Sequence, residues 1–262
     1  MQTSSPETAQ APAEAENDVV ARFLTDYAEP MRARQTSIDA DRPAPLPKAS
    51  QLLAQALAAR RITVKKVVQG RWVFEFAGST IGGYSLSEHG TGVTTLVSAQ
   101  ARRVLRDADK VRAHLDLMEI PHPAPLPKVS ADEATAPLFD LQALTPAPSG
   151  TRLPLRAYAV GPETVSVLVV VPEDSGRTIS VDVTDVVAAE IRTLAVDAMR
   201  AIPGLLCACI ALEVHSLDTA EGAEVVGIDE SASIVPHHFP QLGRGRPVAD
   251  AVAEQILFTA AL

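Results

Sequence analysis

The residues best able to do chemistry lie in one stretch, GIDESASIVPHHFPQLGRGRP, at residues 227–247. It carries two adjacent histidines, His237 and His238, and two arginines in a glycine-rich bend, Arg244 and Arg246. Imidazole nitrogens bind transition metals, and guanidinium groups bind carboxylates and phosphates. Polar and basic groups that converge after an apolar strand are typical of the floor of an active site.

Other residue types argue against a metal site in this stretch. Gly227 and Ala232 stand where a metal enzyme would use carboxylates. Adjacent histidines point in different directions and rarely chelate one ion, so a structural role in the loop is favoured. The glycine-rich bend that carries Arg244 and Arg246 is expected either to bind an anion or to close this part of the fold. The only cysteines, Cys207 and Cys209, lack a second pair at zinc spacing and are expected to be small buried side chains.

Composition limits the class of protein. The chain has 262 residues, 47% of them hydrophobic, and a net charge of −9. The chain is long and apolar enough to bury a hydrophobic core. Its negative charge argues against a nucleic acid or an anionic membrane as partner. No apolar run approaches the roughly 20 residues of a membrane span, and the start of the sequence has no signal-peptide pattern. Residues 1–18 are expected to be a disordered tail, and the protein to be cytoplasmic.

Hydrophobic periodicity places the elements that would position these groups. Helices are expected at 19–34 with a bend or end at Pro30, at 50–61 with Ser50 as N-cap, at 96–120 as one or two helices, at 183–202 with Thr184 as N-cap, and at 246–262 with Pro247 in the first turn. Strands are expected at 62–68 and 71–77, joined as a hairpin, and at 153–161, 164–173, 205–214 and 223–229. The glycine-rich residues 78–92 are expected to form a loop.

This order predicts an α+β fold in two lobes. The N-terminal lobe covers residues 19–130 and the C-terminal lobe residues 151–262. Residues 131–150 show little periodicity and end in a Pro/Ser/Gly cluster, so they are interpreted as a linker.

Three stretches in the correct order resemble ATP-grasp ligases of the cyanophycin-synthetase and bifunctional glutathione-synthetase type. They are LVSAQARRVLRDADKVRAHLDLMEIPHP, DVTDVVAAEIRTLAVDAMRAIPGLLCACIAL and VVGIDESASIVPHHFPQLGRGRPVADAV. The resemblance implies an ATP-dependent carboxylate–amine ligase that forms an acyl phosphate, with divalent cations on the phosphates and a lid that excludes water. It places the phosphate-contacting lysine of the family on Lys110 and an active-site arginine on Arg156.

The sequence departs from the family where the cations would be held. The metal-binding Asp of the family falls on Ala211, its metal-binding Glu on Gly227, and its Asn on Asp229. Alanine and glycine cannot hold a cation, so no metal site is expected. Glu213 and Glu230 lie near in sequence and are the alternative ligands.

The second departure is the lid. Between the lobes the family inserts a lysine-bearing βαββ lid, whereas residues 131–150 contain no lysine and no glycine-rich flap. The expected architecture is therefore a truncated ATP-grasp-like core with the nucleotide-gripping lid deleted. Without a lid, the inner face of the C-terminal sheet, including Leu168, is expected to be apolar and exposed, so a homodimer or hetero-complex should cover it.

The main functional hypothesis is a non-catalytic pseudoenzyme that serves as a binding or partner subunit, associated with an intact peptide- or amide-forming ligase. No cofactor is expected. One alternative is an active ligase with unusual metal ligands, or with a lid from another chain, which would use Mg-ATP. Another is a small carboxylate-binding module that uses Arg156 and Arg246. A hydrolase finds no support, because no serine lies in a GxSxG elbow.

Overall fold

The computed structural model describes residues 19–35, 43–68, 70–86, 92–124, 151–172 and 178–261. The helices are α2 Val19–Phe23, the π-helix η1 Leu24–Ala28, α3 Glu29–Gln35, α4 Ala49–Ala59, α5 Ala99–Leu105, α6 Ala108–Leu117, α7 Ala189–Arg200, α8 Val235–His238 and α9 Val248–Ala260. The strands are β1 Thr63–Val68, β2 Arg71–Phe76, β3 Ser79–Leu86, β4 Gly92–Thr94, β5 Leu153–Val160, β6 Glu163–Pro172, β7 Thr178–Asp182, β8 Cys207–Val214 and β9 Glu224–Asp229.

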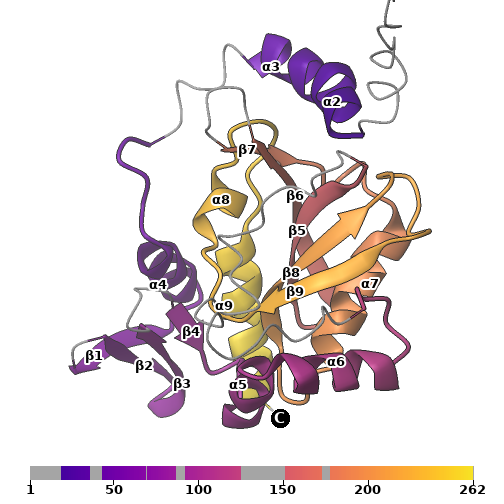
Figure 1. Cartoon of the computed structure of the whole chain (residues 1–262). Helices are drawn as coiled ribbons and strands as arrows, with labels where there is room; N and C mark the ends of the chain where they lie inside the picture. Colours follow the sequence, from indigo (N-terminus) through magenta and orange to yellow (C-terminus); the bar gives the residue numbers. More distant parts are fainter. Residues whose placement is uncertain are drawn as a thin grey trace, which may run out of the picture.

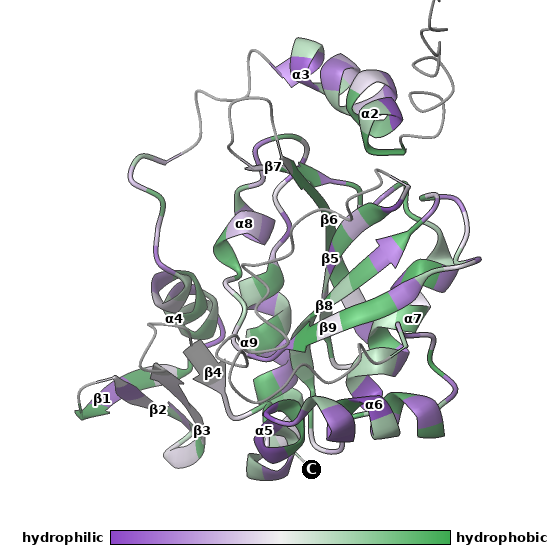
Figure 2. Ribbon diagram, viewed as in Figure 1, coloured by the Kyte–Doolittle hydropathy of each residue, from purple (hydrophilic) through white to green (hydrophobic). Residues whose placement is uncertain are grey.

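The strands form two antiparallel sheets, and the fold is mixed α+β as predicted (Figure 1). A small sheet has the order β1-β2-β3-β4, and a larger one the order β7-β6-β5-β8-β9. Helix α7 packs on one face of the larger sheet, and α9 with α8 on the other. The larger sheet is thus covered on both faces, which explains why β5 and β8 are apolar almost throughout (Figure 2).

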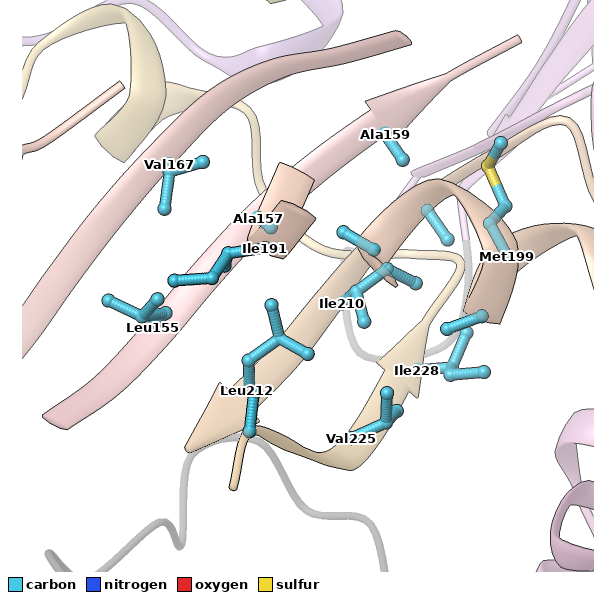
Figure 3. Packing of buried hydrophobic residues seen from close by; sticks show 14 of the residues in the cluster. Leu155, Ala157, Ala159, Val167, Ile191, Met199, Ile210, Leu212, Val225 and Ile228 are labelled. Atoms are coloured by element: carbon cyan, nitrogen blue, oxygen red, sulfur yellow. The ribbon is translucent and has the colours of Figure 1, made fainter. Parts of the chain in front are cut away.

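Two clusters of buried side chains make up the core. The first joins the α7 face of the larger sheet to helices α2, α5 and α6. In Figure 3, Leu155, Ile210 and Leu212 point from the sheet toward Ile191 and Met199 of α7. Each fully buried aliphatic side chain of this kind stabilises the fold by roughly 1.5–3 kcal/mol relative to its exposed state.

The second cluster joins the small sheet and α4 to the α9 face of the larger sheet. Leu57 of α4, Phe74 of β2 and Ile256 of α9 are among its fully buried members. The helices of residues 19–35 and 99–117 therefore share a core with the C-terminal sheet, although they precede residue 130 in sequence. The linker predicted at residues 131–150 lies outside the described residues.

The prediction of a loop at residues 78–92 is wrong for most of its length, because Ser79–Leu86 forms strand β3. Its glycines are explained by close packing. A Cβ at Gly83 would lie 2.7 Å from the carbonyl oxygen of Trp72, and one at Gly82 would lie 2.7 Å from Oγ1 of Thr95. These glycines leave room for a neighbouring backbone and side chain, and they do not mark a bend in the chain.

Two predicted helix caps are also wrong. Helix α4 begins at Ala49 after Lys48, whose N–H donates to Oε1 of Gln51 at 2.7 Å, so Ser50 lies inside the helix. Thr184 lies in a turn before α7, and its hydroxyl donates to Oδ1 of Asp182 at 2.6 Å. Strand β7, which ends at Asp182, was not predicted, because its five residues are too short to show a period.

The N-terminal helix continues past Pro30 instead of ending there. Residues Leu24–Ala28 widen into a π-helix just before it, and α3 then extends to Gln35. A π turn accommodates the proline ring and the hydrogen bond it cannot donate. Within the described part of the chain, no helix has the length and apolar character needed to cross a membrane.

Candidate functional site

One row of residues crosses the larger sheet at the position where the resemblance places the catalytic centre. Asp182, Leu168, Arg156, Ala211 and Gly227 are successive cross-strand partners on β7, β6, β5, β8 and β9. Directly paired residues point to the same face of a sheet. We call the face that carries this row the inner face. The two positions matched to metal ligands of the family thus lie directly opposite each other.

The row supplies few groups for a cation. Ala211 and Gly227 are buried and offer no side-chain oxygen. Asp229, on the same strand as Gly227, accepts hydrogen bonds from the backbone N–H and the hydroxyl of Ser231 at 2.8 and 2.9 Å. Among the described residues no group of three or more His, Cys, Asp or Glu side chains could hold a metal ion. A Mg²⁺ or Ca²⁺ site needs about six oxygen ligands, several of them from the protein.

The two glutamates considered as alternative ligands lie apart from each other. Glu213 lies 4.0 Å from Nη1 of Arg152, which also pairs with Glu224. Glu213 would have to leave this ion pair to bind a cation. Glu230 instead lines a cavity beside Tyr84 of the small sheet, and burial raises the pKa of its carboxyl group.

Arg156 is half-buried on the inner face. Burial lowers the pKa of His237, and the positive charge of Arg156 adds to that lowering. The charge of Arg156 opposes the rise that burial causes in the pKa of Cys209. Burial dominates for the thiol and raises the pKa of Cys209 to about 12, as it does for Cys207. Both cysteines are therefore buried, protonated thiols, in agreement with the prediction from sequence.

The two histidines have separate structural partners. His237 is 3% exposed, its Nδ1 lies 2.8 Å from Oγ of Ser166, and its ring meets the ring of Tyr158 edge-on. Burial lowers the pKa of His237 to about 3, so the ring is neutral. His238 accepts the backbone N–H of Ala249 at Nε2 (3.0 Å), which satisfies a free donor at the start of α9.

The Ser166–His237 pair was not anticipated from the sequence. The two residues are 71 positions apart, and no local motif surrounds the serine. A serine–histidine contact can activate a nucleophile, but Ser166 is 0% exposed and cannot meet a substrate. The pair holds α8 against β6.

Arg246 is engaged by two carboxylates. Its Nε lies 3.0 Å from Oδ2 of Asp182, and its Nη1 and Nη2 lie 2.9 and 2.7 Å from the oxygens of Asp185. These hydrogen bonds raise the pKa of Arg246 and lower that of Asp185. An external anion would have to displace Asp185, the exposed member of the pair. Arg244 is exposed, and its binding role stays a prediction.

Lys110 lies in the first turn of α6. Its Nζ pairs with Asp107 at 2.8 Å, and its side chain is 61% exposed. Asp107 is the N-cap of the helix and accepts the N–H of Lys110. These contacts account for the residue as a helix-start ion pair, and its role as a phosphate-contacting lysine stays a prediction.

The expectation of an exposed apolar inner face is not met in the described residues. Leu168 is 1% exposed, Ala211 is 0% exposed and Cys209 is 2% exposed. Helices α8 and α9 cover part of this face, which explains much of the burial. Leu168 is therefore a core position, and its substitution by Asp would destabilise the fold instead of testing an interface.

Comparison with known proteins identifies structures with a similar fold. No family model and no curated protein matches the sequence. The structure is similar to that of a bifunctional glutathione synthetase from Pasteurella multocida, with a TM-score of 0.63 and 11% identity over 80% of this chain and 44% of that one. It also matches the ATP-grasp ligase PsnB complexed with minimal precursor, Mg and ADP, with a TM-score of 0.43 and 14% identity over 80% of this chain and 95% of that one.

The first match shows that the chain has the fold of an ATP-grasp ligase, at low sequence identity. The chain spans less than half the length of that synthetase. The ATP-grasp-like α+β fold inferred from the three quoted stretches is thereby confirmed, and the deletion of the lid stays a prediction. A fold does not carry an activity, however, and the site must be argued from its own residues.

Proposed function

We propose that this protein is a non-catalytic ATP-grasp-like protein, a pseudoenzyme that acts as a binding or partner subunit beside a peptide- or amide-forming ligase. The observation that carries the proposal is the pairing of Ala211 with Gly227 at the centre of the inner face. Phosphoryl transfer through an acyl phosphate depends on cations that bridge and neutralise the phosphate oxygens. Two of the three positions that would hold those cations have no ligand atom in their side chains.

The length of the chain between the lobes supports the same proposal. Only residues 125–150 separate the two described parts of the chain at the position where the fold family inserts its lid. A βαβ unit alone takes roughly 30 residues or more. A βαββ lid is longer still, so we infer that this chain does not supply one.

The binding or partner role follows from this loss. A chain that keeps an ATP-grasp-like fold but not the cation ligands can still bind another chain, although it lacks the means for phosphoryl transfer. We propose a homodimer or a complex with an intact ligase as the working assembly.

Nucleotide binding tests the proposal directly. Isothermal titration calorimetry of the purified chain with Mg-ATP should show no saturable heat in the micromolar range. A ligand at one hundred times its Kd would stabilise the fold by about 2.7 kcal/mol, which raises Tm by roughly 5–10 °C in a domain of this size. A shift of that size with Mg-ATP, absent with Mg²⁺ alone, would contradict the proposal and favour an active ligase with unusual ligands.

Restoring the missing ligands provides a second test. The double variant Ala211→Asp, Gly227→Glu should form no amide bond and turn over no ATP, because the lid would still be absent. Both positions are buried, so circular dichroism must first show that the variant is folded. Ligase activity in this variant would show that the two substitutions alone had silenced the site.

A further inference from the structure

The small sheet carries positive charge in a chain that is negative overall. Residues 43–96, which hold this sheet and α4, contain six basic and two acidic residues, a net charge of +4, whereas the whole chain has a net charge of −9. The basic residues are Lys48, Arg60, Arg61, Lys65, Lys66 and Arg71. A basic surface on an acidic protein attracts negatively charged partners.

Strand β1 is a free edge of this sheet (Figure 1). Within the described part of the chain it pairs only with β2, and no other backbone hydrogen bond involves Thr63–Val68. Alternate residues of an edge strand direct their N–H and C=O groups away from the sheet, where another extended chain can pair with them. Figure 1 shows β1 on the side of the small sheet that faces away from the larger sheet.

The β1 edge also exposes apolar surface. Val67 and Val68 of β1 are 61% and 52% exposed, and Phe76 at the end of β2 is 40% exposed. An apolar groove of about 230 Å³ lies between α4 and the small sheet, and Val64 of β1 and Trp72 of β2 are among its lining residues. A chain that paired with β1 would therefore cover apolar side chains as well as backbone groups.

The two lysines of β1 lie on opposite faces of the sheet. Lys66 is the cross-strand partner of Trp72, so it lies on the face that carries the groove, whereas Lys65 is the partner of Val73 and lies on the other face. Lys65 forms an ion pair with Glu75 at 2.5 Å. Among the described residues, no ion pair includes Lys66. A strand added to β1 meets both lysines if it has acidic side chains at two successive positions.

The same lysines decide which kind of chain can pair with β1. A second copy that paired through its own β1 would bring four lysines together along six residues of strand. Like charges directly opposite each other destabilise a sheet, and lysines on edge strands prevent such self-association. An acidic strand would instead meet opposite charges.

We propose that β1 pairs with an extended acidic segment of another protein, which adds a fifth strand to the small sheet and places one apolar side chain in the groove beside Trp72. Backbone hydrogen bonds and the burial of apolar surface supply the affinity. An exposed ion pair changes affinity by no more than about fivefold, so the lysines contribute selectivity for acidic strands. The proposal holds whether or not the chain binds nucleotide.

Trp72 reports on this edge of the sheet. It is the only tryptophan of the protein, it lines the groove, and it lies opposite Lys66 of β1. A strand that pairs with β1 and covers the groove should change the surroundings of the indole ring. The fluorescence of Trp72 therefore measures occupation of this edge.

The test is a titration of the full chain at neutral pH with the peptide acetyl-TVEEVT-amide, whose sequence is the same in both directions and so allows parallel or antiparallel pairing. Acetyl-TVKKVT-amide reverses its charge. Acetyl-TPEEPT-amide keeps the charge, but its prolines lack the N–H groups that a strand needs. We expect a saturable change in Trp72 fluorescence with acetyl-TVEEVT-amide, with a Kd below about 1 mM, and binding at least about fivefold weaker for the other two peptides.

A charge reversal on β1 tests the role of the lysines. Lys66→Glu lies at an exposed position and should weaken the binding of acetyl-TVEEVT-amide at least about fivefold while it strengthens the binding of acetyl-TVKKVT-amide. Arg103→Glu makes the same change of charge at an exposed position of α5, outside the small sheet, and should leave the binding of both peptides unaltered.

Hydrogen exchange provides a second measurement that needs no variant. Strand addition should slow the exchange of amide protons of Thr63–Val68 that point away from β2, because they become hydrogen-bonded to the peptide. Attraction between charges alone would leave the rates of these protons unchanged.

Three results would overturn the proposal. In the first, acetyl-TPEEPT-amide, acetyl-TVKKVT-amide or an oligothymidylate of six nucleotides binds as tightly as acetyl-TVEEVT-amide, which would show that the surface does not select an acidic strand. In the second, folded Lys66→Glu keeps the affinity of the wild type for acetyl-TVEEVT-amide. In the third, this peptide alters neither the fluorescence of Trp72 nor the exchange of the β1 amides.

Discussion

The buried imidazole of His237 should make the fold sensitive to acid. Its pKa is about 3 in the native state, because burial disfavours the charged ring, against about 6.5 for an unperturbed histidine. Between these two pKa values, the histidine is protonated in the unfolded chain and neutral in the native chain. The contribution of His237 to the free energy of unfolding is fully present above pH 6.5, and it is lost as the pH falls from 6.5 toward 3.

The size of the effect follows from the two pKa values. Well below pH 6.5 each pH unit costs about 1.4 kcal/mol, and because the unfolded ring is already half protonated at pH 6.5, lowering the pH from 6.5 to 4.5 should cost about 2 kcal/mol through His237. For a protein whose total stability is of the order of 5–15 kcal/mol, this is a large share. Protonation would also place a buried charge beside Ser166, where the positive charge of Arg156 disfavours it further.

Urea denaturation at a series of pH values measures the effect, with Trp72 fluorescence and far-ultraviolet circular dichroism as probes. The variant His237→Gln keeps an amide that can bond to Ser166 but cannot titrate in this range. It will be less stable at neutral pH, and its loss of unfolding free energy between pH 6.5 and 4.5 should be smaller than that of the wild type by about 2 kcal/mol.

The control is His215→Gln, which removes an exposed histidine from the loop after β8 and should leave the pH dependence close to that of the wild type. The reasoning is refuted if His237→Gln and the wild type lose the same free energy over this pH range. That outcome would mean that the ring is protonated in the native state, or that the site opens to water.

Two further predictions concern the buried polar and thiol groups. Arg246→Ala should destabilise the fold by about 3 kcal/mol, since it leaves the buried carboxylate of Asp182 without its cation, while Arg244→Ala at an exposed position should change Tm little. Cys207 and Cys209 should react with a thiol reagent at neutral pH only after denaturation, because burial raises both pKa values to about 12; rapid modification of the native protein would contradict this.

Much of the secondary structure is encoded in local patterns. The apolar runs of β5, β6 and β8, the alternation in β1 and β2, and the spacing in α7 and α9 each lie within one element, so neighbours in sequence are enough to reveal them. The pattern failed at β3, where Gly82 and Gly83 suggested a loop. Glycine is needed at these two positions because Trp72 and Thr95, which belong to other segments, approach them closely.

For the candidate site, the sequence by itself determined which residues are present at the positions matched to the family. It showed that Ala211 and Gly227 have no ligand atoms, and that Asp229 remains. Strand register then decided that the first two lie opposite each other. Register depends on how whole strands pair, and no short stretch of sequence contains that information.

Only the tertiary structure decided the partners of the charged and polar side chains. The sequence predicts that Arg246 binds an anion or closes the lobe, but the fold brings Asp182 to it from 64 residues away. His237 likewise contacts Ser166 across 71 residues. Glu230 lines a cavity together with residues of α4 and β3, which are distant in sequence. Local periodicity reflects neighbours along the chain, whereas ion pairs, pKa values and cavities depend on which distant segments exclude water together.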